Sequence, residues 1–267
     1  MILASASPLS LTLALSAVAA YAVSAVALPK LSERAARAAL WLGWLLHGGL
    51  LLASSVGEPV YFGFAPALSV TVWLVTLVYA VESYLFPLLQ MRWPLSALGV
   101  AAVVLAMVFP GSALHPHASP LLPVHWALGI ASYGLFATAV AHAWFMTRTE
   151  ERIRLGQDTH AGVPLLTIER LTFRFINAGF LLLSATLLLG ILFGGRLYDV
   201  MAPLKWDHKT AFSILAWLTF ATLLFGRARF GWRGKRAVRM LYIGSALLLL
   251  AYVGSRFVME VVLGRAQ

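Results

Sequence analysis

Two histidines that stand at the beginning of long apolar segments are the side chains best placed for cofactor chemistry. His208 follows Trp206 and Asp207 in a polar connector, and His125 precedes Trp126 in PLLPVHWALGIASYGLFATA. Imidazole nitrogens are axial ligands of haem iron, and a carboxylate such as Asp207 can orient a ligating imidazole through its second ring nitrogen. These residue types predict a flat iron-bearing ring held between the two imidazoles, with tryptophans beside it.

A third histidine, His47, lies inside an apolar segment, roughly 13 Å from that segment's end at 1.5 Å per residue. Ionisable groups within a bilayer are costly and usually face a partner or a cavity, so we expect His47 to face other helices rather than lipid. It is either a ligand or a neutral imidazole bonded to a neighbouring helix. For His125 and His208 the alternative is a solvated interface residue, with Asp207 capping the helix that follows.

Other kinds of site find little support in the sequence. The chain has no cysteine, which excludes disulfides, thiolate metal sites and thiol redox chemistry. Soft metals need clusters of Cys or Met, and a carboxylate cage needs more acidic residues than the same regions offer. No Ser-His-Asp arrangement, phosphate-binding loop or dinucleotide fingerprint is present, so the residues do not indicate an enzyme.

Composition identifies the setting of these histidines. Of the 267 residues, 61% are hydrophobic and 11% are charged, whereas soluble domains carry about 25% charged residues. A span of the bilayer core needs about 20 apolar residues. The sequence predicts an all-α membrane protein that forms a single domain over 1–267, with eight transmembrane helices at about 7–28, 38–56, 66–89, 94–110, 125–146, 175–194, 210–226 and 238–260.

The basic residues predict the topology. Fifteen of the 20 Lys and Arg residues fall in alternate connectors, and the positive-inside rule then puts both termini outside and these connectors in the cytoplasm. His125 and His208 accordingly begin helices at the outer face. The net charge of +10 reports topology and contact with membrane lipid, and we expect no nucleic-acid partner. In the longest connector, LLTIERLTFRF should lie along the cytoplasmic interface.

Several stretches resemble the cytochrome c assembly (CcsA/CcmC/HemX-like) superfamily, and most closely its YpjD-type inner-membrane branch. VHWALGIASYGLF resembles the family's histidine followed by its Ser-Tyr helix, and KWDHKTAFSILAWLTF is similar to its tryptophan-rich segment. YFGFAPALSVTVWL, PLLTIERLTFRFINAGFLLL and AYVGSRFVMEVVLGR resemble the third helix, the approach to the sixth helix and the last helix.

The resemblance implies a multi-pass protein of the bacterial inner membrane that holds b-type haem at the outer face. His125 falls on the first external histidine, His47 on the first membrane histidine, and Trp206 and Asp207 on the end of the tryptophan-rich motif. Three features depart from the family: connector 195–207 has one tryptophan, no histidine follows the seventh helix, and SRFVMEVV lacks the second external histidine. His208 occupies the place of a family proline.

Two hypotheses follow. In the first, the chain supports cytochrome c maturation by binding or relaying haem, together with a maturation partner. In the second, it is a non-enzymatic HemX- or YpjD-like partner that regulates another membrane protein or a haem-synthesis enzyme. Haem in the purified protein distinguishes the first from the second.

Overall fold

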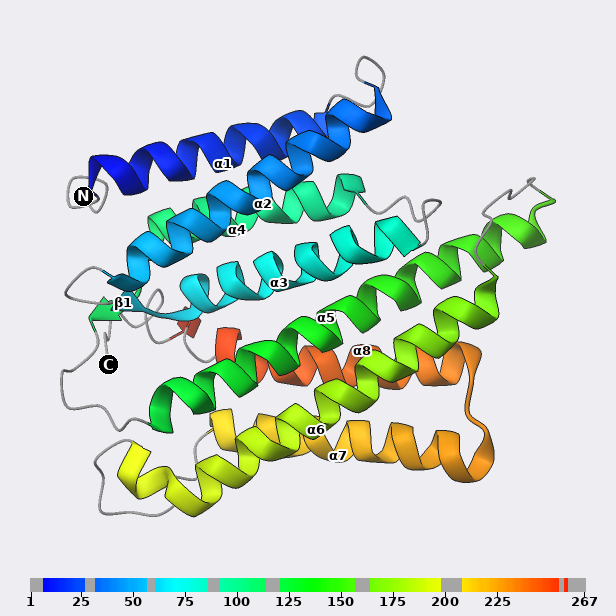
Figure 1. The fold of residues 1–267 in the computed structure, drawn as a ribbon. Coiled ribbons are helices and arrows are strands. Elements are labelled where there is room, and N and C mark those ends of the chain that lie inside the picture. Colours follow the sequence, from blue (N-terminus) through cyan, green and yellow to red (C-terminus); the bar gives the residue numbers. More distant parts are fainter. Residues whose placement is uncertain are drawn as a thin grey trace. The chain divides into compact units, whose positions relative to one another are not determined.

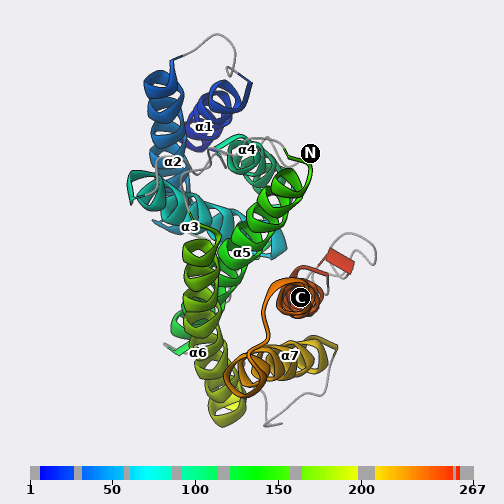
Figure 2. The same cartoon turned by 90° about the vertical axis from the view of Figure 1, so that its right-hand side faces the viewer.

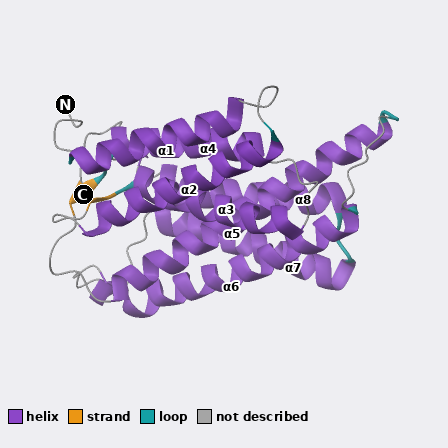
Figure 3. Cartoon of the chain, turned by 45° about the horizontal axis from the view of Figure 1, so that its top comes forward, coloured by secondary structure: helices purple, strands orange, loops and turns teal. Residues whose placement is uncertain are grey.

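The computed structural model of the chain describes residues 7–26, 32–56, 61–85, 92–113, 121–156, 164–197, 208–254 and 257–258, and helices make up almost all of these residues (Figure 3). Two two-residue strands, β1 and β2, pair antiparallel with Tyr61 opposite Ala113. In chain order the elements are α1 (Pro8–Val26), α2 (Glu33–Val56), β1 (Tyr61–Phe62), α3 (Phe64–Leu85), α4 (Arg92–Val108), β2 (Ser112–Ala113), α5 (Leu121–Arg154), α6 (Leu165–Leu197), α7 (His208–Phe230), α8 (Gly234–Leu249) and the π-helical turn η1 (Leu250–Gly254).

All eight predicted segments coincide with helices. Within the described ranges, seven helices are long and apolar enough to cross a membrane, and α4 contributes the shorter apolar stretch Pro94–Val108. The protein is therefore a helical multi-pass membrane protein. A crossing of the membrane by α4 and an outside position of both termini stay predictions.

The helix ends differ from the predicted ones. α5 continues eight residues past the expected end at 146, to Arg154, and α6 begins at Leu165, so LLTIERLTFRF forms its first turns instead of lying along the interface. The added turns are rich in Arg, Glu and Leu, which have high helix propensity. Long basic side chains also keep their charges in water while their stems lie along the helix. The change from apolar to charged residues in the sequence therefore does not coincide with the helix ends.

The described helices divide into two compact units. Unit 1 contains α1 to α4, which run side by side in Figure 1. Its core is formed around the Tyr21 ring, because a Cβ at Gly43 of α2 or at Gly99 of α4 would come within 2.9 Å of that ring. Small residues let membrane helices approach this closely. The glycines are therefore required for the packing of α1 against α2 and α4.

Unit 2 contains α5 to α8 and η1; in Figure 2, α8 is seen nearly end-on between α5 and α7. Its centre is a stack of aromatic rings, in which Phe136 of α5 and Phe220 of α7 lie 3.8 Å apart and almost parallel. Gly179 of α6 lies against Phe136, and Gly244 of α8 lies against Phe220. This one stack thus contacts all four helices of unit 2.

Candidate functional site

His125 lies on the first turns of α5 and faces α6. A Cβ at Gly190 would come 3.5 Å from the imidazole Cε1, and the ring also lies at the backbone of Thr186. The Nδ1 atom is buried and makes no hydrogen bond of standard geometry with the described residues, and the backbone of Thr186 is the group near enough to act on the ring as a hydrogen-bond partner. A buried polar atom without a partner costs about 1–3 kcal/mol. The imidazole thus presents a nitrogen that could accept a hydrogen bond or ligate a metal.

Three other elements reach this end of unit 2. Lys209 on the first turn of α7 is close enough for its charge to act on the His125 imidazole. Its Nζ also lies over the ring of Tyr252, 5.7 Å from the centroid. The Tyr252 ring is 6.4 Å from that of Tyr133 on α5, whose hydroxyl donates a 3.1 Å hydrogen bond to the carbonyl of Leu248. Lys209 therefore interacts with both the His125 imidazole and the Tyr252 ring, and Tyr133 lies about two turns farther along α5.

The sequence reasoning counted Tyr133 among the aromatic residues of the outer side, but it missed Tyr252 and gave Lys209 no role at the site. Tyr252 lies in η1, where i→i+5 bonding replaces α-helical bonding, and such π-helical turns occur frequently at functional sites. The signal in the sequence is weak, because a tyrosine near a helix end also fits an ordinary interfacial aromatic residue. Only the packing of α5, α7 and η1 brings these side chains together.

The other residues predicted for this site are placed as follows. His208 is the first residue of α7 and is exposed, next to Lys209 and thus at the same end of unit 2 as His125. Trp126 is half-buried on α5, and consecutive residues of a helix do not share a face. Trp206 and Asp207 lie outside the described residues, so their roles stay predictions.

His47 is fully buried in unit 1, which confirms that it faces other helices. Its Nδ1 lies 3.3 Å from the Tyr21 hydroxyl of α1, and its Nε2 lies 2.7 Å from Ser69 Oγ of α3. Both ring nitrogens thus have hydrogen-bond partners. Ligation of iron by His47 would require one of these bonds to break, whereas a structural polar bridge among three helices needs no change.

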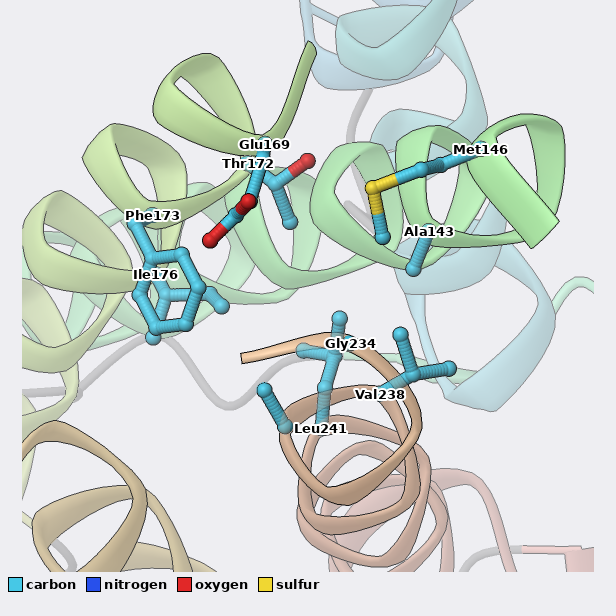
Figure 4. Close-up of a pocket in the computed structure, with 10 residues that line it drawn as sticks. Ala143, Met146, Glu169, Thr172, Phe173, Ile176, Gly234, Val238 and Leu241 are labelled. Atoms are coloured by element: carbon cyan, nitrogen blue, oxygen red, sulfur yellow. The ribbon is translucent and has the colours of Figure 1, made fainter. Parts of the chain in front are cut away.

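At the opposite end of unit 2, Glu169 of α6 binds two arginines. Arg227 Nη1 donates to Oε1 at 2.7 Å, and Arg233 donates from Nε and Nη2 to the two carboxylate oxygens at 2.8 Å. These bonds hold the pKa of the Arg233 guanidinium above its ordinary value. Figure 4 shows Glu169 and Thr172 beside the space that Gly234 and Val238 of α8 border. That space measures about 10 Å³, room for one water molecule at most.

Within the described ranges, no three His, Asp or Glu side chains are grouped so that they could hold a metal ion. A protein cage for a free metal therefore has no support there. A metal that arrives in an organic ring needs only axial ligands from the protein. Of the histidines predicted for the site, His125 offers a buried nitrogen for that purpose.

Comparison with known proteins places these observations in a family. The family model described as "Cytochrome C assembly protein" matches residues 31–263. "Inner membrane protein YpjD" of Escherichia coli K12 is 30% identical over 172 residues, which cover 62% of this chain and 63% of the relative. "Cytochrome c biogenesis protein CcsA" of Prochlorococcus marinus MED4 is 23% identical over 225 residues, 79% of this chain and 66% of the relative.

An uncharacterized 28.8 kDa protein of Azospirillum brasilense is 32% identical over 146 residues, 54% of this chain and 53% of that protein. The matches thus span less than two thirds of the length of these relatives. No solved structure matches the chain.

Proposed function

Because the chain belongs to the cytochrome c assembly protein family, we propose that it supports cytochrome c maturation in the bacterial inner membrane by binding or relaying haem. The proposed site is the end of unit 2 where α5 and α7 begin, which the predicted topology puts at the outer face. The relatives named CcsA are cytochrome c biogenesis proteins by name, and those named YpjD are inner membrane proteins by name.

The observation that carries this proposal is the buried Nδ1 of His125, which makes no hydrogen bond of standard geometry with the described residues. Nitrogen atoms buried in proteins nearly always have a partner, and at a family histidine on the first turns of α5 such an atom suits a ligand that the chain itself does not supply. Iron ligation through Nε2 would leave Nδ1 to donate its proton to a group of the ligand or of a partner. The position on the first turns of a helix, beside α6 and α7, lets several elements border the ligand.

The residues present fit a b-type haem in kind. His125 and His208 would ligate the iron and Trp206 would border the ring, whereas Trp126, on another face of α5 than His125, would reach only the edge of the site. Asp207 would orient an imidazole, and the ammonium of Lys209 has the charge to attract a propionate carboxylate. A partner protein could receive haem that is bound in this way. The residues of this chain would hold it, exclude water from it and set its orientation.

The second candidate is a non-enzymatic partner that regulates another membrane protein or a haem-synthesis enzyme. The hydrogen bonds of His47 favour it, because both ring nitrogens already bond to protein groups. His47 could then ligate iron only after one of these bonds breaks. In this case His125 and Lys209 would form part of a docking surface.

The test is an absorption spectrum of the detergent-purified protein, with His125→Ala and His208→Ala in matched preparations. His142→Gln is the control, since His142 lies on the same helix roughly 26 Å farther along at 1.5 Å per residue. We expect a Soret band in the wild type and in His142→Gln, its loss in His125→Ala, and partial recovery on addition of imidazole.

A colourless wild type from haem-replete cells that co-purifies with one defined membrane protein would favour the regulator. Wild-type spectra in both His125→Ala and His208→Ala would end the ligand hypothesis.

A further inference from the structure

A basic cleft opens at the end of unit 2 opposite His125. It has a volume of about 380 Å³ and is lined by Leu166 and Arg170 of α6, Arg227 of α7, and Gly231 and Arg233 between α7 and α8. Three guanidinium groups thus border one open space, and they come from two stretches of the chain that lie more than 50 residues apart. The maturation site proposed above uses none of them.

Glu169 organises the cleft without neutralising it. Its carboxylate accepts one hydrogen bond from Arg227 and two from Arg233, and a guanidinium has more N–H donors than these bonds use. The Arg227 guanidinium also stacks on Phe173, with Cζ 3.6 Å from the ring centroid. Both arginines are therefore fixed in place, and with Arg170 they leave an excess of positive charge over the single carboxylate.

We propose that this cleft binds a phosphate group, in the form of the headgroup of an anionic phospholipid. Arginine forks match phosphate oxygens in planar, paired hydrogen bonds, and a cleft whose arginines are already held by a carboxylate binds at a lower entropic cost.

The surroundings of the cleft favour a lipid over a soluble phosphate. Leu166, which lines the cleft, is 63% exposed. Phe230, which directly precedes the cleft residue Gly231 in the sequence, is 65% exposed. Such side chains on a membrane-spanning helix face acyl chains rather than water. Trp232 stacks on Phe230, as an aromatic residue at the level of the headgroups does. A headgroup in the cleft would place its acyl chains along these residues.

The experiment measures binding of spin-labelled phosphatidylglycerol to the full-length protein in nanodiscs of phosphatidylcholine. Arg170→Gln removes the cleft arginine that takes no part in the Glu169 bonds described above and leaves those bonds in place. Arg229→Gln is the control, because Arg229 is exposed on the same helix as Arg227, carries the same charge and does not line the cleft. We expect Arg170→Gln to weaken selectivity for the anionic lipid about tenfold, because it removes a hydrogen bond from a guanidinium of the cleft to the charged headgroup. Arg229→Gln removes only a solvated charge outside the cleft and should change the selectivity less than twofold.

A second arm adds inorganic phosphate to nanodiscs that contain phosphatidylcholine alone. One outcome is that millimolar phosphate raises the stability of the wild type and of Arg229→Gln but not that of Arg170→Gln. That result would support a phosphate site in the cleft and identify its ligand as a soluble phosphate rather than a lipid. Equal losses of lipid selectivity in both variants would show diffuse attraction to the basic end of the protein, and would overturn the proposal. No loss in Arg170→Gln, together with no response to phosphate, would overturn it as well.

Discussion

Replacement of His47 by leucine should destabilise unit 1 by about 1–3 kcal/mol. The change removes two hydrogen bonds between helices, from His47 to Tyr21 and to Ser69. Hydrogen bonds between membrane helices contribute about 0.6 kcal/mol on average and about 1.7 kcal/mol at most, so two of them give this range. Leucine is apolar, and it leaves the hydroxyls of Tyr21 and Ser69 without their imidazole partner.

A double-mutant cycle separates the hydrogen bond from the general cost of repacking. We expect His47→Leu and Ser69→Ala to couple by about 0.5–1.7 kcal/mol, since the 2.7 Å bond between them is lost in either variant. The control is Ser54→Ala, because Ser54 Oγ bonds to the carbonyl of Leu50 within its own helix. Its effect should add to that of His47→Leu without coupling.

The assay is reversible unfolding in detergent micelles, with haem per folded protein measured on the same samples. A structural His47 predicts lower stability, coupling to Ser69 and unchanged haem content. If His47→Leu instead lost haem while its stability stayed at the wild-type value, the reasoning from its two hydrogen bonds would be refuted and His47 would return to the haem site.

Three further outcomes are expected elsewhere in the chain. Phe220→Ala should lower the free energy of unfolding by about 3–5 kcal/mol, because Phe220 is fully buried in the aromatic stack; calorimetry that showed less than about 1 kcal/mol would count against that stack as the centre of unit 2. Glu169→Gln should lower the melting temperature, since it weakens the bonds to two arginines, and added salt should narrow the gap to the wild type. Cysteines at Ser112 and Leu155 should label from opposite sides of the membrane with an impermeant reagent, and labelling of both from one side would contradict the predicted topology.

The sequence alone predicted the membrane setting, the number of apolar segments and the family. The membrane setting and the apolar segments follow from properties that add up along the chain, because the length and apolarity of a segment decide whether it can span hydrocarbon. The family was indicated by the resemblance of whole stretches of sequence. The same additive reasoning placed His47 among other helices, since an imidazole inside an apolar run has no partner in lipid. It also set His125 and His208 at helix beginnings, and the structure agrees for both.

The partners of each residue depend on tertiary structure. His47 looked equally suited to a ligand role and to a hydrogen bond, and the choice depends on Tyr21 and Ser69, which stand 26 and 22 residues away in the chain. The helix ends were also misjudged, because a change from apolar to charged residues marks the edge of the hydrocarbon core, whereas an α-helix of Arg and Glu can continue beyond it.

The basic residues show the same division most plainly. Their distribution along the chain indicated topology, and nothing in it distinguishes Arg170 from Arg229. Only when α6, α7 and α8 pack does Glu169 bind Arg227 and Arg233, and only then does Arg170 border a cleft. The number of basic residues in a sequence determines the net charge that the protein places near the membrane. A binding site needs charges at fixed distances, and those distances come from packing between segments far apart in the chain.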